Sequence, residues 1–205
     1  MRTDERHISV ALTGASGMQY GLRLLECLLQ ADRVVHLMLS KPARVVIGME
    51  TDLSLPARAS DARRVLLDTF GGKQEQLFVY GESEWTAPVA SGSGAPRTMV
   101  VCPCTMASVS AFAVGASRSL IERAADVVLK ERGQLILVPR ETPLSLIHLR
   151  NLTALAEAGA TILPANPGFY NRPTRVEEII DFVVARVLEQ LGVEQTLAPK
   201  WGRHD

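Results

Sequence analysis

Cysteine is scarce in this sequence of 205 residues, and neither sign of charge is in excess. The cysteines, Cys27, Cys102 and Cys104, lack the paired spacing of a disulfide framework or a zinc site. Lysine plus arginine number 22, as do aspartate plus glutamate, so no basic surplus favours nucleic acid or an anionic membrane. We therefore predict neither a nucleic-acid partner nor a bound metal.

A long hydrophobic run is also missing. The N-terminal residues MRTDERH are charged, and the apolar run that follows, Ile8–Leu12, is too short for a signal peptide or a membrane span. We therefore expect a cytoplasmic protein, in which Cys102, inside an apolar run, is a buried and inert thiol. Hydrophobic residues still make up 47% of the chain, and oligomerisation is one way to cover apolar surface that a single core leaves exposed.

Short runs rich in Val, Ile and Leu alternate with longer helical patterns. This alternation predicts an α/β fold, a Rossmann-like or flavodoxin-like three-layer sandwich with a mostly parallel sheet. We expect one domain over residues 1–205, with a C-terminal tail at 192–205. The predicted strands are Ile8–Leu12, Val34–Leu39, Leu77–Tyr80, Thr98–Cys102, Gln134–Val138 and Ala160–Leu163. The predicted helices are Met18–Gln30, Ala43–Met49, Ala62–Phe70, Thr105–Val114, Ser119–Glu131, Ser145–Ala158 and Val176–Leu191. Residues 87–97, APVASGSGAPR, are predicted as a flexible loop.

A glycine-rich turn, Thr13-Gly14-Ala15-Ser16-Gly17, joins the first predicted strand to the first helix. Strand, turn and helix together place backbone N–H groups and a helix dipole where an anion can bind. The spacing of Gly14, Gly17 and Gly21 does not match the dinucleotide fingerprint, and no Gly-Lys-Ser/Thr follows as in a P-loop. The turn therefore indicates a phosphate ligand only weakly, because tight turns also use glycine for steric reasons.

Similar segments follow the other strands. The carboxyl ends of parallel strands meet at one edge of a sheet, where ligands of such folds bind. Proline, glycine, small hydroxyl residues and one Arg-Glu pair gather in the segments 13–16, 40–42, 103–106, 139–143 and 164–170. This combination predicts a phosphate-bearing ligand beside a catalytic acid. The alternative is that proline and glycine only end the strands.

Three cations occupy helical positions that need a partner. Arg186 has apolar neighbours on both sides of its helix position, so it either binds an anion or extends its charged end to water. Arg123 and Lys130 share the flank of another helix, with Asp126 between them. These residues fit an anion site or an ion network on the helix surface, and both interpretations stay open.

Four motifs resemble the UbiX-type flavin prenyltransferases, over nearly the whole chain from about His7 to Trp201. They read TGASGMQYGLRLLE, PCTMASVSAFAVG, ERAADVVLKERGQLILVPRETPLSLIHLRNL and PANPGFYNRPTRVEEIIDFVVARVL. The most specific parts are Arg-Glu-Thr-Pro-Leu-Ser after a predicted strand and Pro-x-Phe-Tyr-x-x-Pro before the last helix.

The resemblance implies an enzyme that uses reduced FMN as a substrate and needs no metal. It implies that the dimethylallyl group of dimethylallyl monophosphate is joined to N5 and C6 of the flavin. The product, prenylated FMN, is what a UbiD-type decarboxylase uses as cofactor, for example in ubiquinone biosynthesis. The resemblance also implies a homo-oligomer, a dodecamer. A metal-free reaction suits the sequence, which lacks the Asp-Asp-x-x-Asp motif of Mg²⁺-diphosphate prenyl chemistry.

The resemblance also implies a role for particular residues. The FMN contacts it implies are Gly14, Ala15, Ser16, Ser40, Thr105, Met106, Ala107, Ser108 and Arg140. The dimethylallyl phosphate contacts it implies are Arg123 (from a neighbouring subunit), Lys130, Arg140, Tyr170 and Arg186. Glu141 and Ser16 would move protons, Glu50 would orient the phosphate, and Trp85 and Trp201 would wall the prenyl pocket. Many relatives have Cys-Ser-Met-Lys-Thr where this chain has Cys-Thr-Met-Ala-Ser at 104–108, so a basic residue is lost there.

Other functions share this fold type. A flavin-dependent cysteine decarboxylase would need a histidine near the flavin, yet no histidine lies between His36 and His148. A non-catalytic FMN carrier for a decarboxylase would leave the Arg140–Glu141 pair unexplained. A decarboxylase that acts directly on aromatic acids would release CO₂ without a partner protein.

Overall fold

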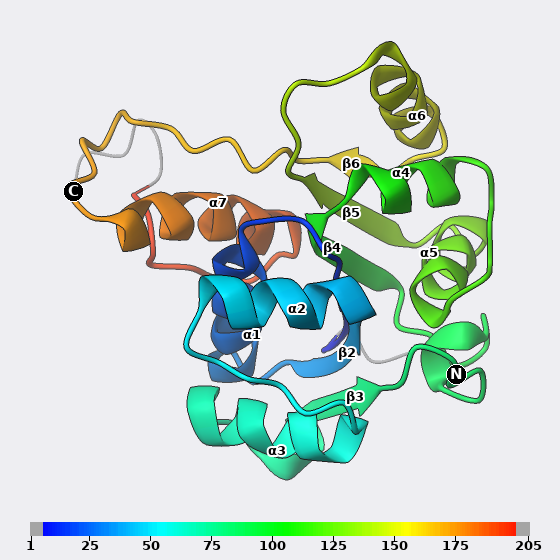
Figure 1. The fold of residues 1–205 in the computed structure, drawn as a ribbon, viewed down its shortest axis with the longest axis horizontal. Helices are drawn as coiled ribbons and strands as arrows, with labels where there is room; N and C mark the ends of the chain where they lie inside the picture. The colour runs from blue at the N-terminus through cyan, green and yellow to red at the C-terminus, as the bar shows by residue number, and fades with distance from the viewer. Residues whose placement is uncertain (1–5, 200–205) are drawn as a thin grey trace.

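The computed structural model describes residues 6–199, and Figure 1 shows a central sheet with helices on both faces. Its strands are β1 (His7–Leu12), β2 (Val34–Leu39), β3 (Leu77–Tyr80), β4 (Thr98–Cys104), β5 (Gln134–Pro139) and β6 (Thr161–Ile162). Among the described residues all neighbouring strands pair in parallel, in the order β3-β2-β1-β4-β5-β6. This is the doubly wound Rossmann order, not the flavodoxin one, and it places the topological switch point between β1 and β4.

Two helical layers enclose the sheet. One core cluster packs against α1 (Met18–Gln30), α2 (Lys41–Glu50), α3 (Ala59–Phe70) and α7 (Val176–Gln190). The other packs against α4 (Met106–Ala113), α5 (Leu120–Lys130) and α6 (Leu146–Glu157). Short 3-10 turns occur at Gln74–Gln76 and Pro88–Ala90. Because both faces are covered, the central strands are almost continuously apolar, as the sequence runs predicted.

Hydroxyl side chains begin several of the helices. Ser40 accepts a hydrogen bond from the Ala43 N–H at the start of α2, and Thr105 accepts one from Ser108 at the start of α4. Such caps satisfy N–H groups that have no partner inside the helix. They also explain why α2 begins before the predicted Ala43, since the cap at Ser40 and a proline in the first turn start it earlier.

The predicted elements are confirmed in type and order, with some differences in extent. β6 is shorter than predicted, and α3 begins at Ala59 rather than Ala62. The predicted flexible loop at 87–97 contains a 3-10 turn instead, and Ala87, Val89 and Ala95 are buried. Apolar packing there outweighs the Gly and Ser content that suggested a loop. Within residues 6–199 no helix is long and apolar enough to cross a membrane. The single domain with a tail remains a prediction.

Candidate functional site at the switch point

The segments after β1 and β4 lie side by side at the carboxyl edge of the sheet. Thr13 organises this contact, because its buried hydroxyl donates to the Pro103 carbonyl at 2.9 Å and accepts from the Thr105 N–H at 2.8 Å. The Thr13 N–H also donates to Pro103, at 3.2 Å. The sequence predicted that Thr13 lies at this edge but not that its hydroxyl joins the two segments. These hydrogen bonds therefore hold the segments after β1 and β4 in a fixed position relative to each other.

The glycine-rich turn is neutralised by a carboxylate from α2. Oε2 of Glu50 accepts hydrogen bonds from the N–H groups of Gly17 and Met18, both at 2.9 Å. Burial raises the pKa of Glu50, but hydrogen bonds from Ser16, Met18 and Gly17 outweigh it, with help from the charge of Arg140, so the net pKa is lowered. An ionised Glu50 thus occupies the positive end of α1, where the sequence suggested a phosphate.

The start of α4 offers a different environment. Thr105 Oγ1 accepts from the Ser108 N–H at 3.1 Å and lies 2.9 Å from the Ser108 hydroxyl. The first turn of this fully described helix contains no acidic residue. Its hydroxyls and its dipole therefore suit an anion better than the start of α1 does, where Glu50 is already bound.

Arg140 joins the two segments of the site. Its Nε donates to the Ser16 carbonyl at 3.2 Å, and its backbone N–H donates to Cys104 at 3.3 Å. The neighbouring Glu141 is exposed and accepts a hydrogen bond from Thr142 at 3.2 Å. The Arg140 guanidinium is thus held beside the turn, and Glu141 follows it in the chain on an exposed segment.

Close backbone contacts fix the remaining edges of this site. A Cβ on Gly14 would lie 2.4 Å from the Pro42 side chain, so the segments after β1 and β2 can touch only because residue 14 is glycine. Tyr20, which the sequence analysis missed, lies near Arg140, whose charge lowers the Tyr20 pKa. Burial and the Cys102 thiol outweigh that effect, so the pKa of Tyr20 is raised.

Comparisons with known proteins identify the family. The Flavoprotein family profile matches residues 1–188. Flavin prenyltransferase UbiX of Pseudomonas aeruginosa is 54% identical over 195 residues, covering 95% of this chain and 93% of the relative. The chain belongs to the UbiX-type flavin prenyltransferase family. A similarly named relative from Alkalihalophilus pseudofirmus is 44% identical, covering 97% of each chain.

Solved structures agree with this assignment. AnUbiX (PadA1), solved with FMN and dimethylallyl pyrophosphate, is 38% identical with a TM-score of 0.86, covering 98% of this chain and 99% of that one. A dodecameric FMN-dependent UbiX-like decarboxylase from Escherichia coli O157:H7 is 38% identical with a TM-score of 0.85, covering 96% and 100%. Peptidyl-cysteine decarboxylase EpiD, at 12% identity and a TM-score of 0.55, shares the fold alone.

The donor set of this UbiX-type chain fits a flavin mononucleotide. The hydroxyls of Ser16, Ser40, Thr105 and Ser108 and the guanidinium of Arg140 belong to segments that follow four neighbouring strands. Hydroxyls and a cation are suitable donors to a phosphate, and the backbone atoms of the turn suit the polar edge of a flavin ring.

Two cations of the predicted donor site lie elsewhere in this chain. Lys130 ends α5 just before β5 begins, and its ion-pair partner is Glu131. Arg186 is exposed and pairs with Glu189 near the end of α7, where the Gln190 carbonyl accepts from Gln134 at the start of β5. Both therefore lie toward the amino edge of the sheet, opposite Arg140. One copy of this UbiX-type chain does not bring these residues together.

The remaining predicted contacts are spread around the molecule. Arg123 donates to the Ala90 carbonyl at 3.0 Å and pairs with Asp126 at 2.9 Å, as the helix-surface network predicted. Lys130 does not join that pair. Trp85 is 47% exposed in the segment after β3, and Tyr170 is 75% exposed beyond β6. Trp201 lies outside the described residues.

The thiols near the switch point are buried. Cys102 is buried, as predicted, and burial raises its pKa to about 12, which disfavours the reactive thiolate. Burial also raises the pKa of Cys104. Within residues 6–199 no group of three or more His, Cys, Asp or Glu side chains is placed to hold a metal ion.

Proposed function

We propose that this chain transfers the dimethylallyl group of dimethylallyl monophosphate to reduced FMN. The observation that carries the proposal is the start of α4, where hydroxyls face an anion site beside Arg140 and Glu141 while Glu50 neutralises α1. The UbiX-named relatives and the structure of AnUbiX with FMN and dimethylallyl pyrophosphate support it.

Residues at the switch point would hold the flavin. The phosphate would bind at the start of α4, against Thr105, Met106, Ala107 and Ser108, and Arg140 with the segments at 14–16 and Ser40 would hold the ring and the ribityl chain. When bound, the reduced flavin supplies nucleophilic N5 and C6 atoms. Ala107 and Ser108 keep a hydroxyl and backbone N–H groups but provide no cation, so the helix dipole supplies the positive field.

The leaving phosphate requires several cations in a site that excludes water. Arg140 belongs to the site in one copy, whereas Lys130 and Arg186 lie at the opposite edge of the sheet. We therefore infer that neighbouring subunits supply these cations, with Arg123, in a homo-oligomer. The dodecameric UbiX-like protein of Escherichia coli supports this assembly.

Protons are assigned to Glu141 and Ser16. Glu141 stands beside Arg140 on an exposed segment, so its carboxylate can take a proton from the flavin side and release it to the departing phosphate. The Ser16 hydroxyl hydrogen-bonds Glu50, whose charge keeps that hydroxyl oriented. Trp85 and Tyr170 would ease positive charge on the allyl carbon through their ring faces.

The product would leave the enzyme. We infer a cytoplasmic protein whose prenylated FMN serves a UbiD-type decarboxylase, because the product is a cofactor and not an end product. We also infer that no metal takes part, and an unchanged rate in the presence of a chelator would agree with this.

Mass spectrometry of the flavin tests the proposal. Purified protein is incubated without oxygen with reduced FMN and dimethylallyl monophosphate, and the flavin should gain one C₅H₈ unit while inorganic phosphate is released. An unmodified flavin would favour the carrier. Solved neighbours named as decarboxylases make a direct decarboxylase the second candidate. CO₂ release from an aromatic acid, with the flavin unchanged, would support that candidate.

A further inference from the structure

The segment at 163–175, called the arm below, projects from the sheet beside α7 (Figure 1). Its first residues are tied to β5, because the Leu163 N–H donates to Leu137 at 2.8 Å and the Ala165 N–H donates to Pro139 at 3.1 Å. Its tip carries Phe169 and Tyr170, which are mostly exposed. A contact other than these hydrogen bonds to β5 must therefore hold the tip of the arm in place.

Contact with α7 holds the middle of the arm. A Cβ on Gly168 would lie 2.7 and 3.0 Å from two atoms of the Phe182 ring, so the backbone of the arm rests directly on that ring. Any larger residue at 168 would push the arm and the ring apart. The position of Phe182 therefore sets the position of the neighbouring Tyr170.

The first half of α7 is less buried than the second half. In this fully described helix full burial begins at Val183, Val176 is 66% exposed, and Ile180 and Phe182 pack against the core but are only partly buried. A cavity of about 790 Å³ lies between α1, α3 and this part of α7, with Phe70 and Ile180 in its lining. Apolar contact therefore holds this part of α7 less firmly than it holds the buried second half of the helix.

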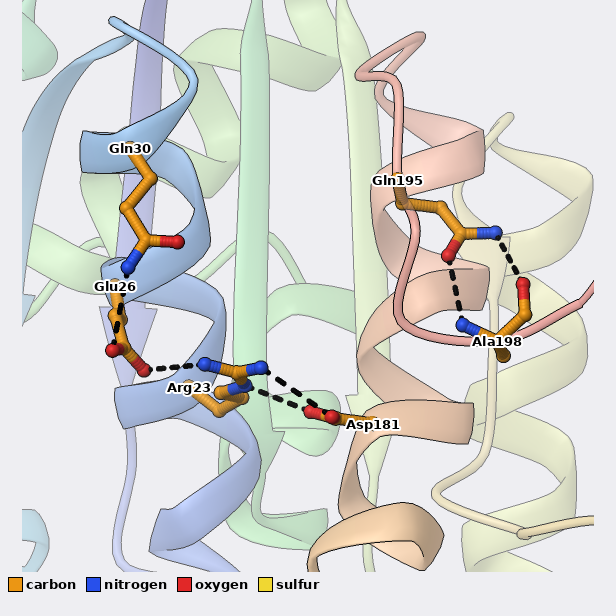
Figure 2. A network of polar contacts seen from close by, with 6 residues as sticks. All are labelled: Arg23, Glu26, Gln30, Asp181, Gln195 and Ala198. Carbon is orange, nitrogen blue, oxygen red and sulfur yellow. Dashed lines mark hydrogen bonds and ion pairs between the residues drawn. The ribbon is translucent and has the colours of Figure 1, made fainter.

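An ion pair crosses from α1 to α7 at this point (Figure 2). Arg23 donates from Nε to Oδ1 of Asp181 at 2.7 Å and from Nη2 to Oδ2 at 3.3 Å. Glu26 orients the guanidinium by accepting from Nη1 at 2.7 Å. Hydrogen bonds to Asp181 and Glu26 raise the pKa of Arg23, and the two-pronged geometry fixes the distance and the rotation between the helices.

We propose that Asp181 and Phe182 are positioning residues for the prenyl donor. Asp181, held by Arg23, fixes the start of α7, and Phe182 seats Gly168 and so places Tyr170 of the arm. This inference rests on the proposed function, in which Tyr170 contacts the donor. The flavin segments are anchored separately, through Thr13 and Glu50, so disturbing the arm should affect the donor and spare the flavin.

Kinetics of the full-length, flavin-loaded protein test this inference. Asp181→Asn and Gly168→Ala should each raise KM for dimethylallyl monophosphate about tenfold or more, with FMN affinity within about twofold of wild type. Arg23→Lys keeps the positive charge but cannot form both hydrogen bonds to Asp181, so the KM of this variant should lie between those of wild type and Asp181→Asn. Asp61→Asn, which breaks an exposed pair on α3, and Gly48→Ala, which meets no atom within 4 Å, are the controls.

Limited cleavage by chymotrypsin at Phe169 and Tyr170 gives a second measurement without turnover. Both test variants should be cut faster than wild type and the controls. The inference would be overturned if both KM for the donor and the rate of cleavage by chymotrypsin were unchanged in the variants. It would also be overturned if kcat and FMN affinity fell together, because that result indicates damage to the whole fold. A wild-type protein that neither binds nor transfers the donor would overturn the proposed function instead. Faster cleavage of the variants would then still support the attachment of the arm, and equal cleavage would refute it.

Discussion

Glu141 is the residue to which the proposed function assigns proton transfer. It follows Arg140 directly after β5, on a segment that is exposed in one copy of the chain. The alternative is a purely structural role, in which Glu141 forms an ion pair with Arg140 that stabilises the loop. Such a pair would contribute little to the stability of the fold at an exposed position. The hydrogen bond of Arg140 goes to the Ser16 carbonyl, which ties the guanidinium to the turn and leaves Glu141 beside the site.

Replacing Glu141 by glutamine separates the two roles. Glu141→Gln keeps size and hydrogen bonding but cannot carry a proton, so FMN binding and assembly should survive. Prenylation should fall about 100-fold or more, the usual scale for losing a positioned acid or base. Single-turnover rates measured by flavin absorbance would show it, with Glu157→Gln on exposed α6 as the control. Near-normal turnover would assign proton transfer to the phosphate or to water.

Glu50 makes a pH-dependent contribution to stability. Its folded pKa is lowered from an ordinary value of 4.5, so the stabilisation is present above that value and is lost as pH falls through the folded pKa. Glu50→Gln should lower the free energy of unfolding by about 0.5–1 kcal/mol at pH 7, through the lost charge at the start of α1.

Urea unfolding at several pH values measures this effect. The gap between wild type and Glu50→Gln should narrow as pH drops below about 4.5, because the carboxylate becomes neutral like the amide. Glu75→Gln, at an exposed position, should show no such gap. A gap that does not change with pH would mean that the charge of Glu50 does not stabilise α1.

At the scale of the elements, α1 packs on β4 through glycine. A Cβ on Gly21 would lie 2.3 Å from the Cys102 carbonyl, so helix and strand approach more closely than any side chain allows. This contact brings the turn at 13–17 to the start of α4. The helical spacing of the sequence indicates which face of α1 is buried, but not that this face lies on β4.

Two glycine substitutions test this contact against a matched control. Gly21→Ala should destabilise the fold by about 1–3 kcal/mol or more, since backbone must move. Gly48→Ala, in open space within α2, should stabilise it by about 0.5–1 kcal/mol, because alanine favours helix. The denaturant midpoints of both variants, compared with that of wild type, measure these changes in stability. A Gly21→Ala protein as stable as wild type would show that α1 and β4 separate at little cost.

At the scale of the whole molecule, apolar side chains remain exposed on one copy. Leu144, Leu146, Ile147 and Leu149 are 42–68% exposed around the start of α6, directly after Glu141. Exposed apolar surface of this kind marks interfaces. Its position supports a site that is shared between subunits, because the segment that carries Glu141 runs straight into it.

Complementation between inactive variants tests the shared site. Glu141→Gln and Arg186→Leu homo-oligomers should each be nearly inactive. After subunit exchange in an equal mixture, about a quarter of shared sites would combine an intact Glu141 with an intact Arg186 from different chains. Activity of the mixture should therefore exceed that of either variant alone. No recovery, with exchange verified by native mass spectrometry, would place both residues in one chain's site.

The sequence predicted those features of this protein that depend on near neighbours along the chain. Short apolar runs, helical spacing of apolar residues and glycine after a buried strand predict elements such as β1 and α1, because these signals are local in the chain. Parallel topology then predicted that the segments at 13–16, 103–106 and 139–143 share an edge. The motifs around Arg140 and Phe169 predicted the family from residue order alone.

Only the tertiary structure decided the contacts between distant residues. Glu50 reaches the start of α1 because α2 ends beside it, so a carboxylate of this chain occupies the positive end of that helix. Lys130 and Arg186 lie toward the far edge of the sheet, although their helix patterns were read correctly. Strand order and the packing of one helix on another set these distances. They result from burying apolar faces against each other, which no single stretch of sequence encodes.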